Sequence, residues 1–179
     1  MMKKIAFPLI ACLALASSAF AGHEMKESKE YKAIPEPCFK DQEFQIDAFG
    51  SSTDTQGGGH ADGFGGGLAF NYFFMRYLGI GVEGNIQSNG GVDPVWDFGG
   101  RLIARYPLEL NGGSLCLAPY IFGGGGVEVD GATVGTFHAG GGLEWRATHT
   151  IGVFGEGRYM WAGGPNDAAQ VRLGVRFVF

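Results

Sequence analysis

The chain has 179 residues, a formal net charge of −5 and 17% charged residues, fewer than the roughly 25% of an ordinary soluble domain. Its 33 glycines and its 13% aromatic residues favour strands joined by turns. The acidic balance and the lack of a basic stripe exclude a nucleic-acid partner.

The first 21 residues have the pattern of a secretory signal peptide. Lys3 and Lys4 precede an apolar run over residues 5–19, and Ala19-Phe20-Ala21 forms a small-x-small cleavage site before Gly22. No later stretch approaches the ~18 consecutive apolar residues of a spanning helix. We therefore expect an exported protein with a signal peptide over residues 1–21 and no transmembrane helix.

Residues 22–42 differ in character from both the leader and the rest of the chain. They carry mixed charges, Pro35 and Pro37, and few large apolar side chains. Such a composition predicts a loosely ordered lead-in segment, here on the periplasmic side.

From Glu43 onward, apolar and polar side chains alternate with the period of two that is typical of a strand with two different faces. Asn-Gly and Asp-Gly pairs between the segments supply tight turns. We predict an all-β fold, an up-and-down antiparallel transmembrane β-barrel of about eight strands over residues 43–179. The alternating segments are residues 44–48, 64–72, 78–87, 96–106, 115–121, 137–146, 151–161 and 170–179. Pro119 cannot donate to a ladder, so we expect a bulge or an irregular start in the fifth segment.

The alternation leaves two barrels open, each the inside-out version of the other. A soluble barrel points its apolar face inward around an apolar ligand, whereas an outer-membrane barrel points it outward into lipid. The aromatic residues favour the membrane barrel because they gather at both strand ends, as interfacial girdles do. The expected girdles are Tyr72, Tyr77, Tyr106, Trp145 and Phe179 at the periplasmic end and Trp96, Tyr159 and Trp161 at the outer end.

The charged side chains lie at the alternate positions of the strands, on the face opposite the apolar side chains. An arginine in this set would cost ~2 to 4 kcal/mol if it faced the lipid midplane, so the set must face the lumen or water. A barrel of about eight strands is just wide enough to be filled by side chains. We therefore predict a closed interior with paired charges and not a pore. The expected interior charge network is Glu83, Asp97, Arg101, Arg105, Glu144, Arg146, Glu156, Arg158, Arg172 and Arg176.

The run from Val171 to Phe179 alternates strictly and ends in phenylalanine. With the alternating segments before it, the chain resembles the small outer-membrane β-barrels of the OmpA and OmpX type of Gram-negative bacteria. The resemblance implies a monomeric, non-enzymatic barrel that serves membrane architecture or surface interaction, in contact with membrane lipid and lipopolysaccharide. It also implies that Val175, Phe177 and Phe179 form a C-terminal signal for the outer-membrane assembly machinery.

Two cysteines, Cys38 and Cys116, remain after removal of the leader, in a compartment where disulfides persist. Cys38 lies just before the first strand and Cys116 at the periplasmic start of the fifth. We expect a disulfide that ties the lead-in segment across the periplasmic mouth; the alternative is two unpaired thiols.

Candidate catalytic and cofactor patterns are weak. Residues 79–84 match the dinucleotide pattern, but they lie in alternating strand sequence with no helix behind them. His60, near Ser51 and Ser52 in the first outer loop, leaves open a lipid A-modifying hydrolase at the outer leaflet. The His-x-Ser arrangement of outer-membrane lipid A deacylases does not occur in the chain. We expect no catalytic, cofactor or metal site, with this hydrolase and the soluble apolar-ligand barrel as alternatives.

Overall fold

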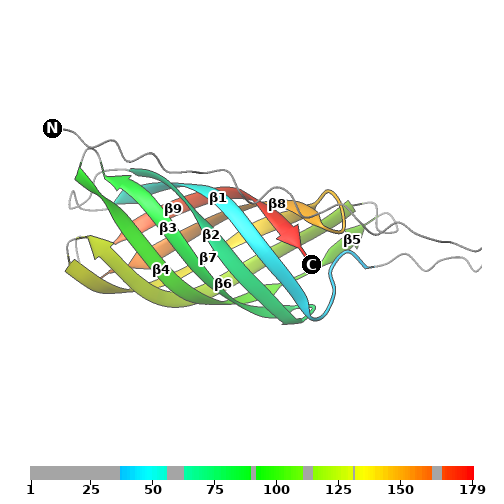
Figure 1. Ribbon diagram of the computed structural model, residues 1–179. Coiled ribbons are helices and arrows are strands. Elements are labelled where there is room, and N and C mark those ends of the chain that lie inside the picture. The colour runs from blue at the N-terminus through cyan, green and yellow to red at the C-terminus, as the bar shows by residue number, and fades with distance from the viewer. Residues whose placement is uncertain (1–36, 56–62, 90–91, 111–114, 131, 163–166) are drawn as a thin grey trace, which may run out of the picture. The chain divides into compact units, whose positions relative to one another are not determined.

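A computed structural model describes residues 37–55, 63–89, 92–110, 115–130, 132–162 and 167–179 (Figure 1). The expected signal peptide and most of the lead-in segment lie outside these residues. No helix in the described ranges is long and apolar enough to cross a membrane, a finding that concerns helices alone. The strands are β1 (Glu43–Thr55), β2 (Gly63–Met75), β3 (Leu78–Asn89), β4 (Val92–Arg105), β5 (Leu108–Leu110), β6 (Leu115–Asp130), β7 (Ala132–Arg146), β8 (Ile151–Trp161) and β9 (Ala168–Val178).

The described strands other than β5 form one closed, antiparallel, eight-stranded barrel. Neighbours in the chain pair with each other, β4 pairs with β6, and β1 pairs with β9 to close the sheet. At this closure Ile46 lies opposite Phe177, and the backbones of Phe44 and Phe179 exchange hydrogen bonds of 3.3 and 2.9 Å. The up-and-down all-β barrel predicted from the alternating pattern is confirmed.

The short strand β5 continues β4 after a break at Tyr106 and Pro107. Pro119 on β6 faces this break, and the Tyr106 N–H donates to its carbonyl oxygen at 2.9 Å. On its other side, Pro119 pairs with Leu143 of β7 in a register that does not shift between Cys116 and Asp130. No bulge forms at Pro119, but the expected irregularity is present as a gap at Pro119 in the pairing of β6 with β4 and β5, across which the register does not change.

The outer wall of the barrel exposes apolar side chains, whereas the interior buries the charged and polar ones together with a smaller set of apolar residues, among them Phe49, Phe73 and Phe122. On β9, Arg172 is 1% exposed whereas the adjacent Leu173 is 69% exposed. This is the reverse of a water-soluble protein, in which arginine is almost never fully buried. The period of two thus sorts the chain into a charged interior and an apolar outer wall.

Glycines on adjacent strands differ in the space around them, which yields a test of this packing. A methyl group on Gly140 of β7 would meet the Gly157 carbonyl oxygen and, at 2.8 Å, the Phe122 ring, whereas one on Gly157 of β8 would meet nothing within 4 Å. We expect Gly140→Ala to lower the free energy of unfolding by ~1 to 3 kcal/mol, as overpacking does. Gly157→Ala is the matched control and should change it by less than ~0.5 kcal/mol.

Urea unfolding in phospholipid vesicles, followed by tryptophan fluorescence, measures both values. Equal stability of the two variants would show that Gly140 does not face a filled interior.

Candidate functional site

The barrel interior gathers the charged residues of the chain and is the candidate functional site. In the described part of the chain it buries six carboxylates and six arginines, so its formal charges balance. All ten residues of the expected charge network are buried there. Sequence reasoning missed Glu43 and Asp47, although the alternation over residues 43–48 gives both the inward parity. The twelve are Glu43, Asp47, Glu83, Asp97, Glu144, Glu156, Arg101, Arg105, Arg146, Arg158, Arg172 and Arg176.

The middle of the lumen is organised around Asp47 on β1. Arg176 of the adjacent β9 donates from Nε and Nη2 to its two carboxylate oxygens, both at 2.7 Å. Nη1 of Arg176 also donates to Glu144 on β7 at 2.6 Å. From β4, Arg101 reaches the same Asp47 at 3.4 Å. One carboxylate therefore links three strands.

Other pairs span the lumen. Arg101 on β4 donates to Glu156 on β8 at 3.1 Å, and the Tyr120 hydroxyl of β6 donates to the same carboxylate at 2.9 Å. Glu83 on β3 accepts from Arg172 of β9 at 2.9 Å and from Arg158 of β8. Since β3 and β8 lie on opposite sides of the eight-strand order, the contact between Glu83 and Arg158 crosses the barrel.

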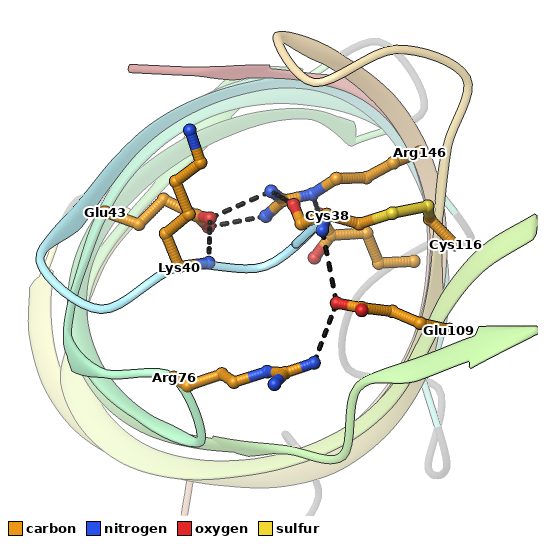
Figure 2. Close-up of a disulfide and its surroundings, with 8 residues drawn as sticks. Cys38, Lys40, Glu43, Arg76, Glu109, Cys116 and Arg146 are labelled. Carbon is orange, nitrogen blue, oxygen red and sulfur yellow. Dashed lines mark hydrogen bonds and ion pairs between the residues drawn. A yellow bond between two sulfur atoms is a disulfide. The ribbon is translucent and has the colours of Figure 1, made fainter. Parts of the chain in front are cut away.

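One mouth of the barrel, the end expected to face the periplasm, is covered by residues that precede β1 (Figure 2). Cys38 and Cys116 form a disulfide with their Cα atoms 6.0 Å apart, as the sequence predicts. Phe39 is 0% exposed. Its ring centroid lies 5.0 Å from the guanidinium carbon of Arg105 and 4.2 Å from that of Arg146, within cation–π range. A phenylalanine of the lead-in segment thus fills the space between two interior arginines.

Hydrogen bonds hold the same segment in place. Arg146 donates to Glu43 at 2.8 Å and to the Cys38 carbonyl oxygen. Glu109, on β5, accepts from the Cys38 N–H at 3.1 Å and from the Arg76 guanidinium at 2.7 Å (Figure 2). The extension beyond the break in β4 therefore provides a carboxylate that anchors the cover of the mouth.

The expected aromatic girdle residues lie on the outer wall, and Tyr159 and Trp161 contact each other with ring centroids 5.0 Å apart. Tyr159 is half-buried, and the remaining ones are exposed: Tyr72, Tyr77, Trp96, Tyr106, Trp145, Trp161 and Phe179. The C-terminal residues Val175, Phe177 and Phe179 also point outward, on or just after β9. This placement is what a lipid interface requires.

The structure describes only some of the residues considered for catalysis. His60 lies outside the described residues, and Ser51 is buried in β1, where its hydroxyl donates to Asn85 at 3.2 Å. Residues 79–84 belong to β3, so the dinucleotide pattern opens no helix. Within the described ranges, no group of three or more His, Cys, Asp or Glu side chains is arranged to hold a metal ion.

Comparison with known proteins identifies the fold. No protein-family model matches the chain, and no curated protein matches it significantly in sequence. Neisserial surface protein A superimposes with a TM-score of 0.59 at 17% identity, covering 75% of this chain and 95% of that one. The N-terminal barrel domain of OprF from Pseudomonas aeruginosa gives 0.62 at 15% identity, covering 78% and 98%. Ail, the attachment invasion locus protein of Yersinia pestis, gives 0.54 at 14% identity, covering 78% and 99%.

These similarities show that the chain has the fold of the small outer-membrane β-barrels, as its resemblance to the OmpA and OmpX type predicts. At such identities the similarity concerns the fold alone, and function has to be argued from the site.

The disulfide yields a stability prediction. Cys38→Ser removes a link between residues 78 positions apart, and we expect it to lower the free energy of unfolding by ~2 to 4 kcal/mol. Urea unfolding of the oxidised protein and of the variant measures the difference. Reduction of the unaltered chain should reproduce the loss and should leave Cys38→Ser unchanged. An oxidised protein no more stable than the variant would contradict a disulfide that tethers the mouth.

The bidentate pair of Asp47 and Arg176 yields a second prediction. Asp47→Asn or Arg176→Met alone leaves a buried charge without its partner, and each should cost ~3 to 5 kcal/mol. The double variant should cost less than the sum of the two, because it leaves neither charge behind. A double-mutant cycle in urea measures this coupling, and strict additivity would contradict a direct pair.

Proposed function

We propose that this protein is a non-enzymatic integral barrel of the bacterial outer membrane, with a closed and charge-balanced interior, that serves membrane architecture or surface interaction. The chain reaches the membrane through the periplasm after its signal peptide is removed. In this proposal it is a monomer surrounded by membrane lipid and lipopolysaccharide. The C-terminal strand, ending in Phe179, is the segment that the assembly machinery recognises.

The observation that carries the proposal is the inversion of the two faces. Large apolar side chains such as Leu102, Phe137 and Leu173 are more than half exposed, on three different strands around the wall. Soluble proteins rarely expose contiguous apolar patches of more than a few hundred Å². A continuous apolar wall with aromatic residues at both ends is suited to a bilayer.

The closed state is supported by contacts that join opposite walls. Glu83 with Arg158 and Arg101 with Glu156 bring side chains from both sides of the lumen into hydrogen-bonding distance. At the periplasmic end, Phe39 and the disulfide cover the mouth. A channel would need a continuous aqueous path past all of these groups, and the balanced charges would give it no selectivity for either sign of ion.

The two alternatives predict other arrangements. A soluble barrel for an apolar ligand needs an apolar lumen, but the interior of the described strands holds six carboxylates and six arginines, and its buried phenylalanine rings pack against the arginines. A lipid hydrolase needs a nucleophile that a base can reach, and Ser51 is already bonded to Asn85 inside the barrel. His60→Ala in the living cell tests the hydrolase, which would require the modification of lipid A to be lost.

Membrane fractionation tests the proposal. We expect the protein in the outer-membrane fraction, and we expect unboiled samples in SDS to migrate differently from boiled ones, because a folded membrane barrel resists the detergent until it is heated. Recovery only in the soluble periplasmic fraction, with no effect of heating, would contradict a membrane barrel.

A further inference from the structure

The outer wall carries an apolar groove of about 840 Å³ over β2, β3, β4 and β6, strands that lie side by side in Figure 1. Four glycines with outward parity, Gly66, Gly84, Gly100 and Gly125, line it. Gly100 and Gly125 face each other directly in the pairing of β4 with β6. The groove is bounded by large side chains, among them Phe70, Ile86, Trp96, Phe98 and Val127.

The packing of the barrel does not require a glycine at the centre of this groove. A methyl group on Gly100 would have the Gly81 carbonyl oxygen as its nearest contact, at 3.7 Å, an ordinary van der Waals distance. On the inner face of β6, by contrast, a methyl group on Gly124 would overlap the backbone of β4 and approach Nε2 of His138 to 2.9 Å. Gly100 therefore leaves open a space that the fold itself would allow a side chain to fill.

The groove has a defined position along the barrel axis, and two stacked rings form one of its sides. Its part on β4 runs from Trp96 to Gly100. In the proposed orientation β4 begins at the outer end of the barrel, which places this part in the outer half of the wall. The rings of Trp96 and Phe98 stack with their centroids 6.1 Å apart and an interplanar angle of 13°. Two aromatic rings thus form a flat boundary that starts at the outer girdle.

We infer that this groove holds one acyl chain of a bilayer lipid in a fixed position against the barrel, an inference that rests on the proposed membrane location. Lipid tails are as apolar as the wall, so contact area rather than the hydrophobic effect decides what occupies a membrane-facing hollow. A slender, flexible chain can follow a floor of glycines between aromatic walls. The convex wall of a second barrel would touch only the rims. Among the residues that the structure describes, the lining contains no arginine or lysine, so recognition is of the chain and not of a phosphate headgroup.

Filling the groove tests this inference. Gly100→Leu places a side chain in the hollow, whereas Gly157→Leu places the same side chain on the outer face of β8, outside the groove, where its Cβ would meet nothing within 4 Å. Each purified, folded barrel is incubated in detergent with dimyristoyl phosphatidylcholine and analysed by native mass spectrometry. The unaltered chain and Gly157→Leu should retain one lipid, and Gly100→Leu should lose about tenfold in the fraction that carries it.

Equal retention by all three proteins would overturn the inference. So would a dimer of the unaltered chain that Gly100→Leu dissociates, because the occupant would then be a second copy. Heat-dependent migration of each variant shows that it is folded. Loss of that shift in the unaltered chain would refute the proposed membrane barrel, whereas folded barrels with equal retention refute the groove alone.

A second measurement needs no substitution in the groove. The unaltered barrel in vesicles that contain a phospholipid with a photoreactive acyl chain should be labelled several-fold more on β3 and β4 than around Gly157 on β8, as the groove predicts. Uniform labelling around the wall would contradict a fixed chain and would leave only a fluid annulus of lipid.

Discussion

The structure depends on one constraint, which is that the six arginines inside the described strands cannot be buried without partners. Arginine remains protonated, so burial cannot be relieved by loss of its proton. The interior meets this constraint with an equal number of carboxylates, placed on strands that are often far apart in the sheet. Asp47 and Glu83 each receive more than one guanidinium group, so the pairs form a connected network and not a set of isolated bridges. Such a network specifies one register, because a slip of one residue would turn the charges of the slipped strand onto the apolar outer wall.

The closed mouth follows from the same constraint. Arg105 and Arg146 lie at the mouth beside Phe39, where the network would otherwise stop with its charges open to water. Glu43 accepts from both of them, and Phe39 packs between their guanidinium groups. The disulfide and Glu109 then fix the segment that carries Phe39. The lead-in segment thereby becomes part of the interior, and the barrel gains a cover that comes from its own chain. The proposed closure of this mouth thus follows from pairing the end of the network.

The sequence predicted the barrel, its inward charges and the disulfide because each rests on a local pattern. A period of two tells Arg172 from Leu173 without knowledge of any contact. The partners of each charge could not be predicted, since Glu83 and Arg158 meet only when opposite walls close. Glu43 and Asp47 carried a readable signal in the parity of residues 43–48, whereas the burial of Phe39 carried none, because residues 22–42 show no periodicity. Of the two outcomes expected at Pro119, the bulge is absent and the irregularity is present, because the pairing is interrupted there without a change of register.

The central claim is that paired charges close the lumen, and single-channel recording in a planar bilayer tests it most directly. The unaltered barrel should give no conductance steps. Folded Glu144→Ala should leak, because Arg146 and Arg176 lose a shared carboxylate and must draw water into the lumen. Stable open steps in the unaltered protein, or a folded Glu144→Ala barrel as silent as the unaltered one, would contradict an interior closed by its ion pairs.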